Sequence, residues 1–194
     1  HLGATFEALG HNQQAKAAYQ RAAALSPRQA QVQYDYGRLC QNLGELEQAT
    51  AALEEAIALR PDWPEAHYQL GHAHQLSGHL THALTRYQEA ARLAPDEAGY
   101  KRAVGLTQRW MGQTKQAIAA LEEAVELAPQ DAEMHADLAK ALAKNGQHET
   151  ALAHYQRAAA LAPAEAPALP PLADTVVVVI GLPRSGTSLM MQML

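Results

Sequence analysis

Residues 44–61 read GELEQATAALEEAIALRP, and this arrangement of small, large and helix-ending residues returns along most of the chain. Two alanines flank Leu53 at a spacing that places all three side chains on one face of a helix. Gly44 suits a tight connection before that helix because glycine reaches left-handed backbone angles without steric cost. Pro61 ends the segment because proline lacks a backbone donor and clashes inside a continuing helix. We therefore expect a helix between Gly44 and Pro61.

Every landmark of this stretch recurs with a period of 34 residues, which is typical of an array of helix-turn-helix repeats. The recurring positions are Gly10, Gly44, Gly78, Gly112 and Gly146; Ala15, Ala49, Ala83, Ala117 and Ala151; Ala22, Ala56, Ala90, Ala124 and Ala158; Pro27, Pro61, Pro95, Pro129 and Pro163; Tyr19, Leu53, Tyr87, Leu121 and Tyr155; and Gly3, Gly37, Gly71, Gly105 and Ala139. Because these series stay in phase, we predict four whole helical hairpins that begin near Ala30, Pro64, Ala98 and Ala132. An incomplete hairpin precedes them, so we expect the natural protein to extend before His1.

This register resembles the tetratricopeptide repeat family over residues 1 to about 165. The resemblance implies an all-α superhelical solenoid of antiparallel helix pairs, which we assign to residues 1–162. The sequence departs from the family pattern at the first large position, where Gln33, His67, Lys101 and His135 replace the usual tryptophan. We expect different helix packing there. Each hairpin of such an array buries its apolar face only against its neighbours, so the end near His1 is expected to be the least stable.

In this family the first helix of each hairpin lines a concave groove that holds a peptide or a partner domain. The resemblance therefore implies partner-binding residues at Tyr34, Arg38, Tyr68, His72, Arg102 and Arg109. Further polar candidates on the same helices are Gln31, Gln41, Glu65, Gln75, Glu133 and Lys140. The Lys, Asn, Asn, Lys, Arg set that grips the C-terminal carboxylate of chaperones in one subset of the family is not found here. The alternative interpretation of each candidate is a polar side chain that only faces solvent.

Composition narrows the function further. The chain is 48% hydrophobic but only 5% aromatic, which favours close-packed helices over a bulky β-sandwich core. A net charge of -5 lacks the basic footprint of a general nucleic-acid binder, so nucleic acid is not expected as a partner. The single cysteine, Cys40, is compatible with a reducing compartment, and we expect a cytoplasmic protein. The longest aliphatic run, residues 176–180, is far shorter than the roughly 20 residues that a membrane-spanning helix needs.

Five of the ten histidines lie between His67 and His82, which raises the possibility of a metal site. His72 and His74 are two residues apart and point in different directions on a helix. Helical neighbours would be His67 with His74, or His79 with His82, and each pair supplies at most two ligands. We interpret these residues as surface or packing histidines and expect no metal.

Trp110 and Met111 stand just before the turn at Gly112. They could form an exposed interaction spot, but we interpret them as core or capping contacts between the two helices of a hairpin.

The repeat pattern ends after Leu161. Four prolines in an alanine-rich stretch predict an extended linker over residues 163–174.

Residues 175–180 read TVVVVI, which predicts a strand buried on both faces of a parallel sheet. The following residues 181–188 read GLPRSGTS and precede a short apolar stretch, so the order is strand, glycine-bounded loop and helix. Backbone N–H groups at such a helix start are suited to hold a polyanion. The loop is nearly a Walker A motif, but Thr187 stands in the place of its lysine.

Residues 183–189 match, position by position, the loop P-R-S-G-T-[TS]-L of sulfotransferases that use 3′-phosphoadenosine 5′-phosphosulfate. Residues 175–194 thus resemble the first strand, loop and helix of a truncated α/β sulfotransferase domain of the tyrosylprotein-sulfotransferase-like branch. The resemblance implies that the donor is bound by Pro183, Arg184, Ser185, Gly186, Thr187 and Ser188. It also implies a catalytic role for Arg184, whose guanidinium would offset charge on the bridging oxygen as the sulfuryl group leaves.

Two functions follow as expectations. In the first, the parent protein is a sulfotransferase that transfers a sulfuryl group to an acceptor hydroxyl, while the repeats recruit a protein or peptide or mediate self-association; bacterial proteins with this arrangement are familiar. The 3′-phosphate site and the general base would then lie beyond Leu194, so residues 1–194 alone are expected to be inactive. In the alternative, the chain is a non-catalytic scaffold and the repeats are its whole function.

Overall fold

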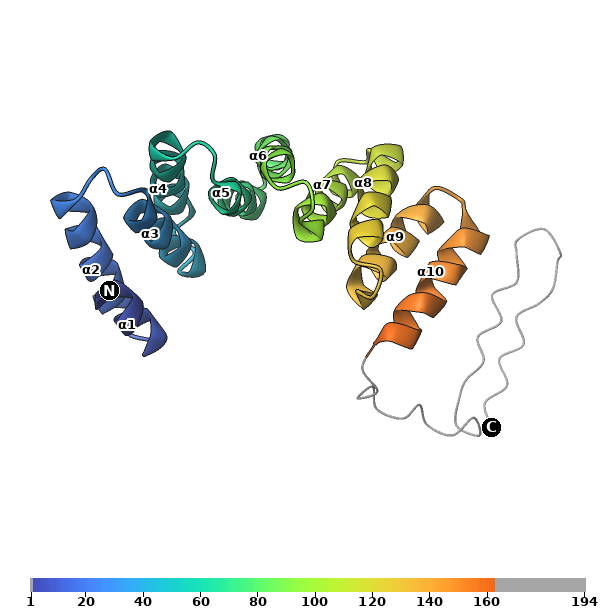
Figure 1. The fold of residues 1–194 in the computed structure, drawn as a ribbon, viewed down its shortest axis with the longest axis horizontal. Coiled ribbons are helices and arrows are strands. Elements are labelled where there is room, and N and C mark those ends of the chain that lie inside the picture. Colours follow the sequence, from blue (N-terminus) through green and yellow to red (C-terminus); the bar gives the residue numbers. More distant parts are fainter. Residues whose placement is uncertain (1, 163–194) are drawn as a thin grey trace, which may run out of the picture. The chain divides into compact units, whose positions relative to one another are not determined.

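The computed structural model describes residues 2–162, and all regular secondary structure in this range is α-helical (Figure 1). The helices are α1 (Leu2–Ala8), α2 (Asn12–Leu25), α3 (Ala30–Asn42), α4 (Leu46–Leu59), α5 (Pro64–Leu76), α6 (Leu80–Leu93), α7 (Ala98–Trp110), α8 (Thr114–Leu127), α9 (Ala132–Lys144) and α10 (His148–Leu161). The predicted starts of the four whole hairpins are confirmed, since α3, α5, α7 and α9 begin at those residues. The predicted linker, strand and phosphate-binding loop, residues 163–194, lie outside the described residues.

The turn inside each hairpin depends on a glycine in the left-handed region, as the sequence predicts. Gly44, between α3 and α4, has a φ of 76°, and its four counterparts have φ between 73° and 82°. The chain then reverses, and the N–H of Glu45 donates to the carbonyl of Cys40 at 2.9 Å. This bond satisfies one of the carbonyls that the end of α3 leaves without a helical partner.

Within each hairpin, a small residue on the first helix meets a large residue on the second. A β-carbon on Gly37 would lie 2.7 Å from Cγ of Leu53, and one on Gly105 would lie 2.7 Å from Cγ of Leu121. Both leucines are fully buried. The two helices therefore approach more closely than they would with any larger side chain at the glycine positions.

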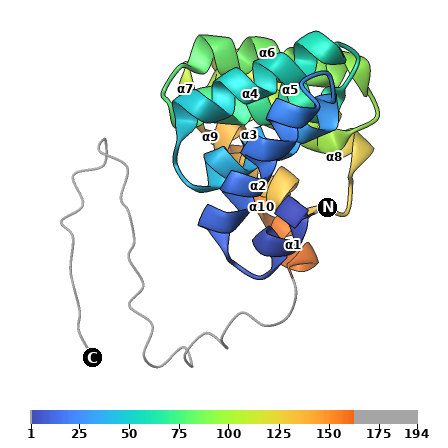
Figure 2. The same ribbon diagram turned by 90° about the vertical axis from the view of Figure 1, so that its left-hand side faces the viewer.

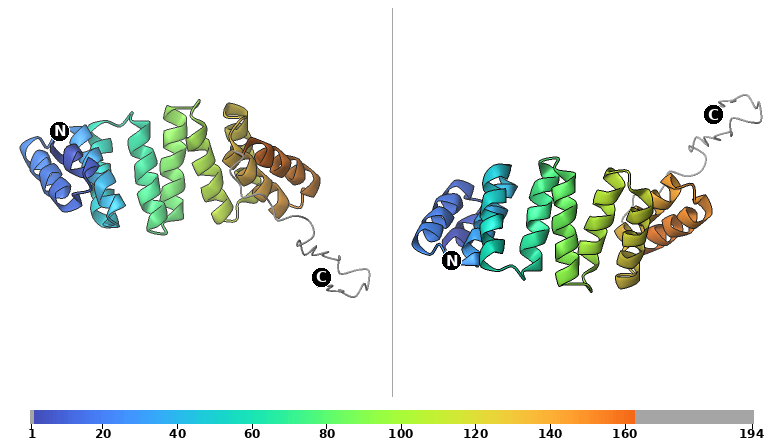
Figure 3. Two further views of the ribbon diagram at one scale, coloured as in Figure 1. Left: turned by 90° about the horizontal axis from the view of Figure 1, so that it is seen from below. Right: turned by 90° about the horizontal axis from the view of Figure 1, so that it is seen from above.

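Successive hairpins stack in chain order, and Figure 3 shows this order from two sides. The second helix of each hairpin packs against the first helix of the next, and α3 also contacts α5, as α7 contacts α9. Figure 1 shows the odd-numbered helices on the inner side of the array and the even-numbered helices on the outer side. Figure 2, which looks along the array from its α1 end, places α1 and α2 nearest the viewer. The inner side is the surface that the family resemblance assigns to partners.

Two of the four residues at the usual tryptophan position, His67 and His135, tether the loops between hairpins. Nε2 of His67 donates to the carbonyl of Pro61 at 2.9 Å, and Nε2 of His135 donates to that of Pro129 at 3.1 Å. Lys101 forms an ion pair with Glu123 instead. At these three positions, hydrogen bonds and an ion pair thus stand where the family has a tryptophan.

None of the helices in residues 2–162 combines the length and the apolar character that crossing a membrane requires.

Candidate functional site

The six predicted partner-binding residues all lie on the odd-numbered helices: Tyr34 and Arg38 on α3, Tyr68 and His72 on α5, and Arg102 and Arg109 on α7. We call the side of α3, α5, α7 and α9 that carries them the inner face. Their neighbours differ widely, and those neighbours decide which groups remain available to a partner.

Tyr34 packs against Trp63, a tryptophan that the sequence pattern did not indicate as part of a site. The ring centroids of Tyr34 and Trp63 are 4.5 Å apart, and Trp63 is only 7% exposed. The guanidinium carbon of Arg60 lies 4.8 Å from the centroid of the same tryptophan. Burial raises the pKa of Tyr34, followed by smaller effects that include the negative charge of Glu65. Tyr34 is therefore an aromatic side chain that is fixed by packing and still partly exposed.

Tyr68 lies between two other tyrosines. Its ring centroid is 5.3 Å from that of Tyr87 and 5.2 Å from that of Tyr100. Tyr87 is buried, and its hydroxyl donates to Oε1 of Gln75 at 2.7 Å. Tyr100 is only partly buried. Burial raises the pKa of Tyr100 to about 12, and the negative charges of Glu65 and Glu97 add to the effect.

Arg38 is held by an ion pair across two hairpins. Its guanidinium lies 2.8 Å from the carboxylate of Glu7 on α1. The hydroxyl of Tyr19 donates to the same carboxylate at 3.3 Å. Arg38 thus connects the first two hairpins and is not a free cation.

Arg102 is held in the same way at the other end of the array. Its guanidinium lies 2.8 Å from Glu133 and 2.8 Å from Asp137, both on α9. The side chain of Asp137 is only 7% exposed and also lies 3.2 Å from Nζ of Lys140. In contrast, Arg109 has no ion-pair partner within residues 2–162, so it is the predicted arginine that remains available.

His72 accepts a hydrogen bond at Nδ1 from the side-chain amide of Gln41. Burial lowers the pKa of His72, which agrees with a neutral imidazole that accepts this bond. Oε1 of Gln41 is buried and has no hydrogen-bond partner within the described part of the chain. The hydrogen bond between Gln41 and His72 links α3 to α5.

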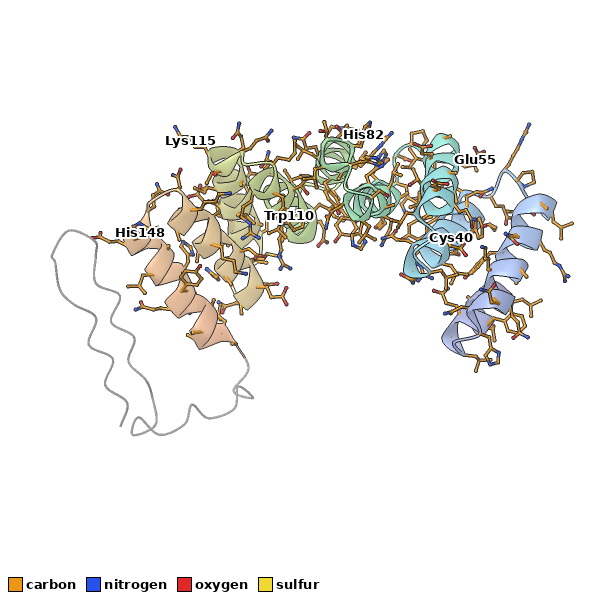
Figure 4. All side chains as sticks on the ribbon, turned by 180° about the vertical axis from the view of Figure 1, so that it is seen from behind. Cys40, Glu55, His82, Trp110, Lys115 and His148 are labelled. Atoms are coloured by element: carbon orange, nitrogen blue, oxygen red, sulfur yellow. The ribbon has the colours of Figure 1, made fainter. Side chains whose placement is uncertain are left out.

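The interpretation of Trp110 and Met111 as core or capping contacts is confirmed only for Met111, which is the C-cap residue of α7, and Trp110 is not a core residue. The evidence for Trp110 is its exposure. The side chain of Trp110 is 49% exposed, because it is the last residue of α7 and the chain turns away at Gly112. Figure 4 labels it at the end of that helix. Trp63, the other tryptophan, is the buried one.

The histidines assemble in a group that helical spacing alone did not predict. The rings of His74, His79 and His82 have centroids 5.3 to 6.3 Å apart, at the turn between α5 and α6. Burial and then the neighbouring His82 lower the pKa of His74. Figure 4 shows His82 on the outer side of the array, away from the inner face. Across residues 2–162, no three histidine, cysteine or carboxylate side chains are arranged to hold a metal ion.

Comparison with protein families identifies one recurrent motif. Four family models described as tetratricopeptide or TPR repeats match residues 1–29, 37–78, 64–97 and 102–166, which together span most of the helical region. A search of the curated proteins found no significant match.

Comparison with solved structures finds similar folds. MamA is 22% identical with a TM-score of 0.79, and the match covers 83% of this chain and 94% of MamA. YrrB, described as a TPR protein with an unusual peptide-binding site, is 19% identical with a TM-score of 0.72, covering 84% of each chain. The thermophilic TPR protein TTC0263 of Thermus thermophilus is 26% identical with a TM-score of 0.63, covering 84% of this chain and 90% of that one.

Proposed function

This chain belongs to the tetratricopeptide repeat proteins, and we propose that it is a protein-interaction scaffold whose inner face binds an extended segment of a partner polypeptide. The observation that carries the proposal is the row of partly exposed tyrosines, Tyr34, Tyr68 and Tyr100, on three successive hairpins. Tyrosine supplies a large contact area at a small cost in conformational entropy, and it is enriched among the residues that dominate binding energy.

The geometry of the array suits an extended ligand. Packed helices lie about 8–10 Å apart, and an extended chain advances about 3.3 Å per residue, so roughly every third residue of a bound peptide would meet a new helix. The ion pairs of Arg38 with Glu7 and of Arg102 with Asp137 join neighbouring hairpins. These links hold the inner face in one arrangement before binding, which lowers the entropic cost of association.

A selection from a random library of twelve-residue peptides, displayed on phage, tests the proposal on the whole 194-residue chain. We expect selected peptides to lose at least about tenfold in affinity when Tyr68 is replaced by alanine, because a central aromatic anchor is removed. Tyr155→Ala is the matched control, since this tyrosine is 41% exposed on the outer helix α10. Peptides that respond to Tyr155→Ala and not to Tyr68→Ala would overturn the assignment of the inner face, as would a failure to select any peptide.

A second function is supported by the motif at residues 183–189. We propose that the longer parent protein is a sulfotransferase in which Arg184 and its neighbours bind the 5′-phosphosulfate of 3′-phosphoadenosine 5′-phosphosulfate. The support is the match of sequence alone, because these residues lie outside the described part of the chain. In that protein the helical array would recruit the acceptor, and this recruitment would be one case of the partner binding proposed for the inner face.

This second proposal is tested on the parent protein by calorimetric titration with 3′-phosphoadenosine 5′-phosphate. Arg184→Ala should weaken binding at least about tenfold, because a bidentate guanidinium contact to the anion is lost. Arg157→Ala removes an exposed arginine of α10 and should leave the affinity unchanged. If Arg184→Ala has no effect, Arg184 is not part of a donor site.

A further inference from the structure

The inner face carries a compact aromatic surface built from three hairpins. Tyr68 and Tyr100 have ring centroids 5.2 Å apart, and both Tyr34 and Tyr68 lie close enough to Tyr100 to raise its pKa. All three rings are partly exposed. An aromatic ring presents a negative electrostatic potential above its face, so such a surface attracts cations.

A carboxylate without an ion-pair partner accompanies these rings. Glu65 is the second residue of α5 and is exposed, and the described residues contain no cation within ion-pair distance of it. Its negative charge contributes to the raised pKa of both Tyr34 and Tyr100, after the larger effect of burial. Glu65 and Tyr68 are three residues apart on α5, so both side chains lie on one side of that helix.

The remaining charges around the rings are also mostly negative. Glu97 acts on Tyr100, and Asp35 acts on Tyr34. The charge of Arg38, which lowers the pKa of Tyr34, is compensated by the ion pair with Glu7. Arg60, which lies over the neighbouring ring of Trp63, is paired with Asp62. The surface is thus complementary to a positive group and unfavourable for an acidic one.

We infer that Tyr34, Tyr68, Tyr100 and Glu65 form a binding surface that selects an arginine or lysine side chain of the bound peptide; this inference rests on the proposed scaffold function. A guanidinium stacks on aromatic rings while its N–H groups bond a carboxylate, and it is more weakly hydrated than an ammonium group. The chain already contains such a contact, since the guanidinium of Arg60 lies over the ring of Trp63 on the neighbouring loop. The partner is accordingly a polypeptide segment with a basic residue, and arginine is preferred over lysine.

The experiment uses fluorescein-labelled copies of the selected twelve-residue peptides, together with copies in which each arginine in turn is replaced by citrulline and each lysine by norleucine. Citrulline keeps the shape of arginine but carries no charge. Affinities are measured by fluorescence polarisation at about 0.15 M salt, where the general attraction of a basic peptide to this acidic chain is largely screened.

One neutral replacement should lower affinity for the wild-type chain at least about tenfold. The loss should be clearly smaller for the Glu65→Gln variant, because the partner carboxylate is already absent and only the attraction of the rings for the cation remains. Glu55→Gln is the matched control, since Figure 4 shows this glutamate on the outer helix α4. That variant should retain the full loss seen with the wild-type chain.

The outcomes separate this inference from the function on which it rests. Peptides that depend on Tyr68 but contain no basic residue, or that tolerate every neutral replacement, would leave the scaffold function standing and overturn the selection of a basic side chain. Peptides that do not depend on Tyr68 at all would overturn both.

Discussion

The β-carbon that Gly71 lacks would lie 2.8 Å from two ring carbons of Tyr87, Cδ1 and Cε1. Tyr87 is 1% exposed, and its hydroxyl donates to Gln75 at 2.7 Å, so the ring is confined by packing and by a hydrogen bond. The contact shows why the small residue of the first helix and the large residue of the second recur together.

Gly71→Ala should destabilise the protein. Alanine favours a helix over glycine by about 1 kcal/mol. Overpacking a confined core costs about 1–3 kcal/mol, so the cost equals or exceeds the gain in helix propensity. The measurement is the urea midpoint of the variant against the wild type. Gly99→Ala is the control, because the nearest atom to its β-carbon is a flexible carboxylate oxygen at 3.5 Å. It should be neutral or slightly stabilising, and equal midpoints for Gly71→Ala and the wild type would contradict the packing argument.

Arg102→Met should destabilise the array by about 2 kcal/mol or more, because Asp137 is nearly buried and would keep only Lys140 as a cationic neighbour. The additional replacement Asp137→Leu should recover much of the loss, since no buried charge then remains unpaired. Arg92→Met, which removes an exposed pair with Glu89, should change the urea midpoint little. If Arg102→Met also changes it little, the network does not join α7 to α9 in the way that the distances indicate.

Stability should fall as the pH is lowered from about 7.5 to about 5.5, across the ordinary histidine pKa. Burial lowers the pKa of His154 from its ordinary value of 6.5, as does the positive charge of His135, while Glu122 acts in the opposite direction. At a pH just below 6.5, the folded chain therefore binds fewer protons than the unfolded chain, and protonation favours unfolding. His72 and His74, whose pKa values are also lowered, act with the same sign.

His154→Gln should make this decline shallower. Nε2 of His135 donates to the carbonyl of Pro129, so Nδ1 of the same ring accepts a hydrogen bond from Nδ1 of His154, 2.9 Å away. A glutamine at position 154 can donate to the same acceptor but does not titrate. Thermal midpoints at several pH values across the same interval provide the measurement. His148→Gln, at the exposed start of α10, should retain the wild-type pH dependence. An identical slope for His154→Gln and the wild type would show that protonation of His154 is not linked to folding.

The two tryptophans should differ in fluorescence. With Trp63→Phe, emission comes from Trp110, which is 49% exposed, so it should lie at longer wavelength and be strongly quenched by acrylamide. With Trp110→Phe, emission comes from Trp63, which is 7% exposed and covered by Tyr34, so quenching should be several times weaker. Similar quenching of both variants would mean that Trp110 is covered in solution.

The comparison of sequence with structure separates two kinds of candidate residue. The aromatic members of the predicted site, Tyr34 and Tyr68, keep a partly exposed surface on the inner face. Two of the three predicted arginines, Arg38 and Arg102, are instead occupied by ion pairs. The sequence pattern placed all of them on the first helices of their hairpins, where the structure has them, but carried no signal for which charges would be neutralised.

The sequence by itself determined the hairpins and their boundaries, because each signal acts locally: Gly44 closes a turn between adjacent helices, and Pro61 follows closely on the end of α4 at Leu59. Only the tertiary structure decided which polar groups remain free. Arg38 and Glu7 are 31 residues apart in sequence, and Arg102 and Asp137 are 35 apart. Such pairs form across stacked hairpins, and the physical reason is that their distance depends on the packing between repeats, which no single repeat encodes.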